Sequence, residues 1–192
     1  MSAAKIGVLA LQGDVREHLA MLGELGADAR PVRLAPELEG LLGLVIPGGE
    51  STTMSRLILR FDLLEPLQAA FTAGLAALTT CAGTILAARE IRDGLPDQVR
   101  LGLLDIVVRR NAFGRQRESA EVMLDIPAVG PGAVPVAFIR APAIEEVGPG
   151  VEVLATYRDE PAAVRQGRHL ALTFHPEITG DLRLHRLFLS GL

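Results

Sequence analysis

The stretch LAALTTCAG occupies residues 75–83 and decides the fold class. Gly74 ends the helical pattern before it, so we expect a buried strand over 75–80. Alanine and leucine would suit a helix as well, but a helical pattern resumes only after Ala82. The stretch therefore predicts a strand, a tight turn at Cys81 and a helix, which is the basic unit of a parallel sheet.

The same alternation precedes this stretch. Asp14 followed by Glu17 has the spacing of a capping box, and Val15, Leu19, Leu22 and Leu25 would share one helix face. The pattern predicts strands at 6–11, 32–34 and 43–46, and helices from 14 to about 25, at 51–60 and at 63–73. Strands that alternate with helices imply parallel pairing with helices on both faces of the sheet.

The second half of the chain is richer in strands. We expect strands at 103–108, 121–126, 136–139, 151–157, 162–165 and 170–174, loops where Gly and Pro cluster at 127–135 and 142–150, and a helix over 180–192. The expected fold is α/β: a mostly parallel sheet flanked by helices, with a small antiparallel extension. Length and the absence of a linker pattern predict a single domain over 1–192.

Composition excludes several classes of protein. The chain has 192 residues, of which 49% are hydrophobic and 22% charged, so it is not intrinsically disordered. Cys81 is the only cysteine, which excludes an internal disulfide. The net charge is −4 and the charges are intermixed, so we expect no nucleic acid partner. The sequence shows neither a membrane span nor a signal peptide, and we expect a cytoplasmic protein with a reduced cysteine.

Cys81 stands where a strand is expected to end and a helix to begin. A nucleophile at such a turn is exposed above the sheet, and the small neighbours Ala82 and Gly83 let the backbone bend. The helix that follows would point its positive end at the sulfur and favour the reactive thiolate. The alternative is a buried cysteine that acts only as a small hydrophobic residue.

A cysteine nucleophile needs a base, and the base needs an orienting group. His175 ends a predicted strand, at the type of sheet edge where Cys81 also lies. Glu177 follows two residues later across Pro176, so it could hold one imidazole nitrogen while the other faces the sulfur. The alternative is a strand-end histidine beside a solvated glutamate. His18 and His185 fall within helical patterns, and we expect them to face solvent or helix contacts.

The loop PGGESTT at 47–53 also joins a strand to a helix. It is not a phosphate-binding loop, because the G-x-x-x-x-G-K-[ST] pattern is absent. We expect an oxyanion hole, in which the N–H groups of Gly49 and Ala82 converge on a developing negative charge. The alternative is an ordinary turn in which Ser51 caps the helix.

The combined motifs resemble class I glutamine amidotransferases and, within that superfamily, the family of glutaminase subunits of pyridoxal 5'-phosphate synthase. The resemblance covers nearly the whole chain. Its motifs are GVLALQGDVREH at 7–18, VIPGGESTTM at 45–54, TCAG at 80–83, LGLLDIVVRRNAFGRQ at 101–116, FIRAP at 138–142 and FHPE at 174–177.

The resemblance implies a role for each matching residue. Cys81 attacks the side-chain amide of L-glutamine, His175 transfers protons and Glu177 orients His175. The glutamine pocket would be lined by Gly49, Glu50, Ser51, Arg110, Ile139 and Arg140. An arginine fork suits the substrate carboxylate, although surface ion pairing is the alternative for Arg110 and Arg140. No metal or cofactor is implied on this chain.

The resemblance also implies a partner, a barrel-shaped synthase subunit that activates the glutaminase. This partner would use the ammonia with a pentose phosphate and a triose phosphate to build pyridoxal 5'-phosphate. Two alternatives stay open. The chain could serve another acceptor, as in imidazole glycerol phosphate synthase, or it could be a non-catalytic binding subunit in which Cys81 is inert.

One residue departs from the superfamily pattern. Glycine is usual two residues before the nucleophile, whereas this chain has Thr79. A β-branched side chain could crowd a tight turn. Because Ala82 and Gly83 are retained, we expect the turn to form.

Overall fold

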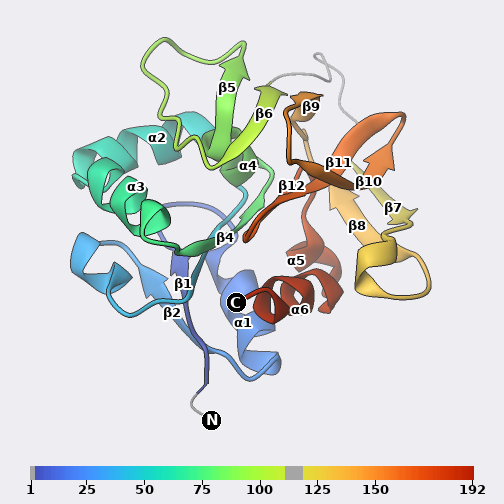
Figure 1. The fold of residues 1–192 in the computed structure, drawn as a ribbon, viewed down its shortest axis with the longest axis horizontal. Helices are drawn as coiled ribbons and strands as arrows, with labels where there is room; N and C mark the ends of the chain where they lie inside the picture. Colours follow the sequence, from blue (N-terminus) through green and yellow to red (C-terminus); the bar gives the residue numbers. More distant parts are fainter. Residues whose placement is uncertain (1–2, 111–118) are drawn as a thin grey trace.

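The computed structural model describes residues 3–110 and 119–192 (Figure 1). Its centre is a seven-stranded sheet in the order β10-β11-β12-β4-β3-β1-β2. The five strands from β12 to β2 run parallel, and β10 and β11 extend the sheet antiparallel. The strands are β1 (Lys5–Leu9), β2 (Asp28–Val32), β3 (Gly43–Ile46), β4 (Ala76–Thr80), β10 (Glu152–Tyr157), β11 (Glu160–Gln166) and β12 (His169–Leu172). The expected mixed sheet is confirmed.

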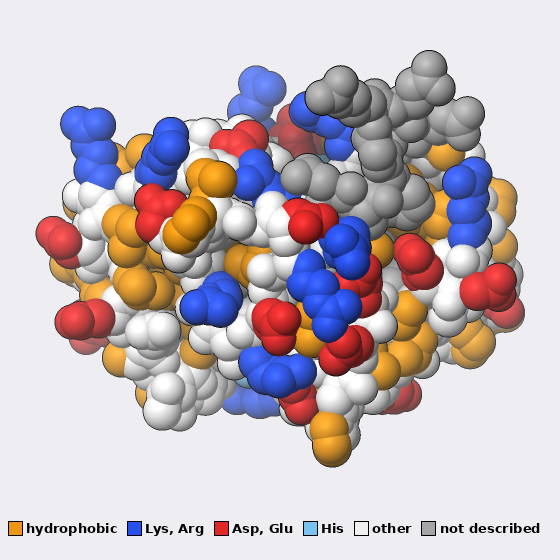
Figure 2. Space-filling view, turned by 90° about the horizontal axis from the view of Figure 1, so that it is seen from above, with side chains coloured by type: hydrophobic (Ala, Val, Ile, Leu, Met, Phe, Trp, Pro, Cys, Tyr) orange, Lys and Arg blue, Asp and Glu red, His pale blue; other side chains and the backbone are white. Residues whose placement is uncertain are grey.

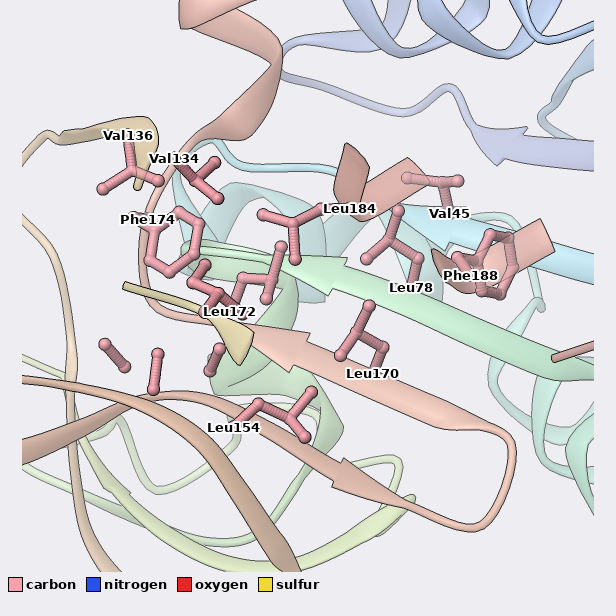
Figure 3. Close-up of a cluster of buried hydrophobic side chains, with 14 of the residues drawn as sticks. Val45, Leu78, Val134, Val136, Leu154, Leu170, Leu172, Phe174, Leu184 and Phe188 are labelled. Atoms are coloured by element: carbon pink, nitrogen blue, oxygen red, sulfur yellow. The ribbon is translucent and has the colours of Figure 1, made fainter. Parts of the chain in front are cut away.

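Helices cover both faces of this sheet, because successive side chains of a strand point to opposite sides. In β3, Val45 points to the side of α1 and α6, where it shares a core cluster with Leu78 and Phe188 (Figure 3). Leu44 and Ile46 point to the opposite side and pack in the cluster of α2, α3 and α4. The helices are α1 (Val15–Glu24), α2 (Ser51–Arg60), α3 (Leu64–Thr72), α4 (Ala82–Ala87), α5 (Pro176–Thr179) and α6 (Arg183–Ser190).

Two smaller sheets lie beside the central one (Figure 1). In the first, β6 pairs in parallel with β5 and antiparallel with β9; in the second, β7 and β8 form an antiparallel pair. The bounds are β5 (Ala88–Arg92), β6 (Leu104–Arg109), β7 (Ala120–Leu124), β8 (Val134–Phe138) and β9 (Ala143–Val147), with short 3₁₀ turns η1 (Ala35–Leu38) and η2 (Pro127–Val129).

Several local predictions are wrong. The segment 142–150 is not a continuous loop, because β9 crosses it and its hydrogen bonds come from the distant strand β6. The predicted helix after the Cys81 turn forms as the six-residue α4, but the strand β5 that follows it from Ala88 was not predicted. The edge strand β2 begins at Asp28, earlier than expected, and contains Pro31, which an edge position tolerates. Asp14 precedes α1 without any side-chain capping bond.

Charges of both signs are interspersed on the face shown in Figure 2. On the small sheet, Arg92 donates to Glu145 at 2.7 Å, and Arg109 donates to Asp93 at 3.0 Å. Exposed pairs of this kind contribute little to stability, because solvent screens them. Within the described ranges, no helix has both the length and the apolar character needed to cross a membrane.

Gly83 lets α4 pack directly on β3, and we expect its replacement to destabilise the fold. A Cβ at Gly83 would stand 2.1 Å from the Ile46 carbonyl oxygen, so Gly83→Ala must push the helix from the sheet. We expect the free energy of unfolding to fall by about 1–3 kcal/mol, measured by denaturant titration.

The matched control is Gly23→Ala in α1, where a Cβ would meet no atom within 4 Å. That variant should gain up to about 1 kcal/mol, since alanine favours a helix over glycine. Equal effects of the two substitutions would contradict this view of the α4–β3 contact.

Candidate active site

Cys81 lies at the turn between β4 and α4, as the sequence predicts. Its backbone has φ 44° and ψ −104°, a left-handed conformation that is unusual for a residue with a side chain. Two sets of hydrogen bonds hold it there: the Cys81 N–H donates to the Leu172 carbonyl at 2.9 Å, and the Cys81 carbonyl accepts from Thr84 and Ile85. A sharp turn of this kind presents a side chain at the edge of the sheet.

Thr79 fits the turn without crowding it. Its side chain is fully buried, and its hydroxyl lies 3.0 Å from the hydroxyl of Thr84. Thr84 in turn donates to the Leu172 carbonyl at 2.7 Å. The β-branched residue therefore joins the hydrogen bonds that fasten α4 to the sheet.

His175 reaches Cys81 because β12 is the parallel neighbour of β4. The chain continues past the end of β12 to His175, whose backbone N–H donates to the Ala137 carbonyl at 2.8 Å. Its Nδ1 lies 2.7 Å from Oε1 of Glu177, and its imidazole lines the same pocket as the Cys81 side chain, whose thiol donates to the Ile139 carbonyl at 3.9 Å. The structure thus brings together the three residues that the sequence analysis singled out, in the order sulfur, imidazole, carboxylate.

The electrostatics of this group favour a charged pair. Burial alone would lower the pKa of His175, but its contacts with Asp14, Cys81 and Glu177 outweigh burial and raise the pKa. Burial alone would raise the pKa of Glu177, but hydrogen bonds from His175 and His18 outweigh it and lower the pKa. Glu177 is therefore an anion that stabilises a protonated imidazole.

Asp14 is a site residue that the sequence analysis missed. Its Oδ2 lies 3.2 Å from Nδ1 of His175, so His175 faces two carboxylates. Asp14, His175 and Glu177 bring possible metal-ligand atoms within 4.8 Å of one another. The same short distances arise when two carboxylates, here those of Asp14 and Glu177, face one imidazole N–H. The sequence pattern predicts only a helix cap at Asp14, because the approach of its loop to His175 is a contact between distant segments.

A pocket of about 360 Å³ opens beside the sulfur. It is lined by Gln12, Asp14, Gly49, Glu50, Ser51, Cys81, Ala82, Ile85, Arg110, Ile139, Arg140, His175 and Ile178. All six residues expected in the substrate pocket are among them, as are both expected oxyanion-hole residues. Glu177 is not, because it is buried behind His175. Gln12, Ile85 and Ile178 are additional lining residues; Gln12 lies within the motif at 7–18 without an expected pocket role, and the two isoleucines lie outside every motif.

Glu50, rather than Ser51, caps helix α2. Its carboxylate accepts hydrogen bonds from the N–H groups of Thr52 at 3.0 Å and Thr53 at 2.7 Å. Although partial burial opposes ionisation, these bonds lower the pKa of Glu50 to about 2. The anion accepts a further bond from Arg110 Nη2 at 2.8 Å, which holds the guanidinium over the pocket.

Gly49 and Ala82, the expected oxyanion-hole residues, line the pocket from the loop after β3 and from the start of α4. The first N–H groups of a helix have no partner within that helix, so Ala82 at the start of α4 can serve an anion. Gly49 lies against Gln12: a Cβ at Gly49 would stand 2.4 Å from Gln12 Oε1, which accepts the Glu50 N–H at 2.6 Å.

The remaining histidines differ partly from expectation. His18 and His185 contact each other between helices α1 and α6, so the expected helix contact is confirmed. Both side chains are fully buried, and the alternative that they face solvent is wrong. His169 lies at the start of β12. Within the motif at 101–116, residues 111–116 lie outside the described residues.

Comparison with known proteins agrees with this geometry. The model of the SNO glutamine amidotransferase family matches residues 8–192. The chain is 61% identical over 190 residues to "Pyridoxal 5'-phosphate synthase subunit PdxT" of Parafrankia sp. (strain EAN1pec), covering 99% of this chain and 94% of the relative. A protein of the same name from Mycobacteroides abscessus is 58% identical over 185 residues, covering 96% of this chain and 95% of the relative.

Solved structures show the same fold. A crystal structure described as a glutamine amidotransferase superposes with a TM-score of 0.89 at 50% identity and covers 97% of both chains. The structure of PurLQS from Thermotoga maritima has a TM-score of 0.71 at 16% identity over 99% of both chains, a likeness of fold alone. From the family match and these relatives together, the chain belongs to the SNO glutamine amidotransferase family.

Proposed function

We propose that residues 1–192 act as one glutaminase domain, which hydrolyses L-glutamine to L-glutamate and ammonia for pyridoxal 5'-phosphate synthase. The observation that carries the proposal is the group of Cys81, His175 and Glu177 at one sheet edge, opening into a pocket that holds two arginines. Family membership supports amide chemistry at that site.

In the first half of the reaction, the Cys81 thiolate attacks the side-chain amide carbon of glutamine. The Cys81 proton resides on His175, which the anionic Glu177 stabilises. The carbonyl oxygen becomes an oxyanion, which the N–H groups of Gly49 and Ala82 stabilise, each donor contributing about 3–4 kcal/mol. When the C–N bond breaks, His175 gives its proton to the nitrogen and ammonia leaves. The enzyme then carries a thioester on Cys81.

In the second half, water attacks the thioester carbon and His175 accepts a proton from that water. A second oxyanion collapses, the C–S bond breaks and glutamate leaves, while the proton on His175 balances the regenerated thiolate. The sum is L-glutamine and water giving L-glutamate and ammonia. Acid–base help from His175 is worth about 10²–10⁴-fold in rate.

The arginines suit the α-carboxylate of the substrate, since a guanidinium offers a planar fork of donors. Arg110 donates from Nη2 to Glu50, which holds its guanidinium at the pocket. Arg140 and Ile139 approach the same pocket from the segment after β8, and Ser51 approaches from the start of α2. Glu50 thus acts by positioning Arg110 as well as by capping α2.

The ammonia acceptor we propose is the synthase subunit of pyridoxal 5'-phosphate synthase, a barrel-shaped enzyme. Support comes from the relatives, which are named as subunits of that synthase. Ammonia released into neutral water is largely protonated and no longer nucleophilic, so a sheltered transfer to a bound partner makes chemical sense. We place the reaction in the cytoplasm, where thiols such as Cys81 stay reduced.

Cys81→Ala should abolish glutamate release, because no other cysteine can form the thioester. The measurement is glutamate production from glutamine with the synthase subunit added, together with pyridoxal 5'-phosphate absorbance. Glutamine binding by calorimetry should persist and serves as the control for an intact pocket. Continued hydrolysis by this variant would disprove the assigned nucleophile, and pyridoxal 5'-phosphate made from added ammonium would show that the partner itself is intact.

Glu177→Gln should lower kcat by at least about 10²-fold, whereas Asp14→Asn should have a much smaller effect. Glu177 is buried and lies 2.7 Å from His175 Nδ1, but Asp14 is partly exposed and lies at 3.2 Å. Both carboxylates raise the pKa of His175, so the imidazole keeps its proton to higher pH. Each substitution should therefore lower the pH at which His175 loses that proton, as seen by NMR titration. A larger loss of activity in Asp14→Asn would reverse the roles proposed here.

A further inference from the structure

Two buried histidines lie next to the proposed catalytic group without a part in the reaction above. His18 in α1 and His185 in α6 are both fully buried, and Nδ1 of His18 lies 2.8 Å from Nε2 of His185. The other nitrogen of His18, Nε2, lies 3.5 Å from Glu177 Oε1 and 3.4 Å from the Thr80 hydroxyl. His18 therefore touches both the orienting carboxylate and the residue before the nucleophile.

Two imidazoles in an apolar core are unfavourable for the stability of the fold. Leu22, one turn along α1 from His18, and Leu184, beside His185, belong to the surrounding apolar cluster. A buried polar atom without a hydrogen bond destabilises the fold, and His185 Nδ1 has no partner within 3–110 and 119–192. Apolar side chains would avoid that cost, so packing alone does not explain the two imidazoles.

Glu177 supplies the explanation, because its charge is otherwise poorly compensated. Its side chain is fully buried, and within the described part of the chain Oε2 has no hydrogen-bond partner. The carboxylate therefore depends on two imidazoles at Oε1: His175 at 2.7 Å and His18 at 3.5 Å. Removing one of two donors from a buried anion is costly, since the anion cannot recruit water.

The contacts of His18 favour one of its two neutral tautomers. A neutral imidazole has one N–H and one bare nitrogen. If His185 Nε2–H donates to His18 Nδ1, then His18 Nε2 carries the proton and points it at the carboxylate. The opposite tautomer would aim a lone pair of His18 at Glu177 and would leave a buried His185 N–H without an acceptor. A doubly protonated His18 also donates from Nε2.

We propose that His18 is a positioning residue: its Nε2–H holds the Glu177 carboxylate in the orientation that receives Nδ1–H of His175. His185 acts one step further out by keeping the proton of His18 on Nε2. The chain of contacts thus runs from α6 through α1 and α5 to the base at the sheet edge. Only the kinetic test of this inference depends on the proposed glutaminase function.

The kinetic test compares His18→Gln with His18→Asn. The glutamine amide lies one bond further from the backbone and can reach the position of Nε2, which serves Glu177. The shorter asparagine amide reaches only the position of Nδ1, which serves His185. We expect kcat with the synthase subunit present to fall about tenfold or more in His18→Asn relative to His18→Gln, with KM little changed. Rates are divided by the fraction of sites labelled by a diazoketone analogue of glutamine, which removes the contribution of misfolded protein.

The matched control is His169, which is half-buried at the end of β12 away from His175. His169→Gln and His169→Asn should both leave kcat unchanged. If His18→Asn equals or exceeds His18→Gln per labelled site, His18 serves only the contact between α1 and α6, and the proposal is wrong.

A second measurement does not depend on activity. The ¹⁵N chemical shifts of the His18 imidazole in the wild-type protein distinguish a protonated from a bare nitrogen, and we expect the proton on Nε2. A bare Nε2 would overturn the proposal even in an active enzyme. Wild-type protein that releases no glutamate with its partner would instead contradict the proposed function, and the NMR result would still decide the role of His18.

Discussion

Parallel hydrogen bonding between β4 and β12 places the catalytic group. The register pairs Thr79 with Ala171 and Thr80 with Leu172, so both strands end at the same edge. Because the Cys81 N–H then donates to the Leu172 carbonyl, the nucleophile turn is fastened to the strand that leads to His175. A shift of this register would separate sulfur from imidazole, whatever the other contacts of the site.

The second requirement is a buried negative charge. Glu177 lies behind His175, out of the pocket, where solvent cannot screen it. An anion in such a place is tolerated only when it is paired, and here the imidazoles of His175 and His18, from two different segments, lie at its Oε1. The same charge that costs stability keeps a proton on His175 beside the sulfur. The Glu177 carboxylate therefore affects both the stability of the fold and the protonation of the catalytic base.

Where sequence reasoning failed, the missing information was non-local. The strand β9 has a weak pattern of its own between Pro142 and Gly150, and it forms because β6 offers a partner edge. The local pattern predicts that Asp14 caps α1, yet its carboxylate faces His175. Ser51 was the expected cap of α2 under the ordinary-turn alternative, but Glu50 takes that place because its longer side chain reaches the N–H groups of Thr52 and Thr53.

Local sequence patterns were enough to predict the parallel α/β sheet, the turn at Cys81 and the candidate residues His175 and Glu177. Periodic apolar residues and a strand–turn–helix pattern are local signals, and the motifs are contiguous. Tertiary contacts bring Asp14 into the site, place Glu177 behind the pocket, and connect His18 and His185 to the group from the core. These are contacts between segments far apart in the chain, and they arise from the packing of helices on a sheet, which no single stretch of sequence encodes.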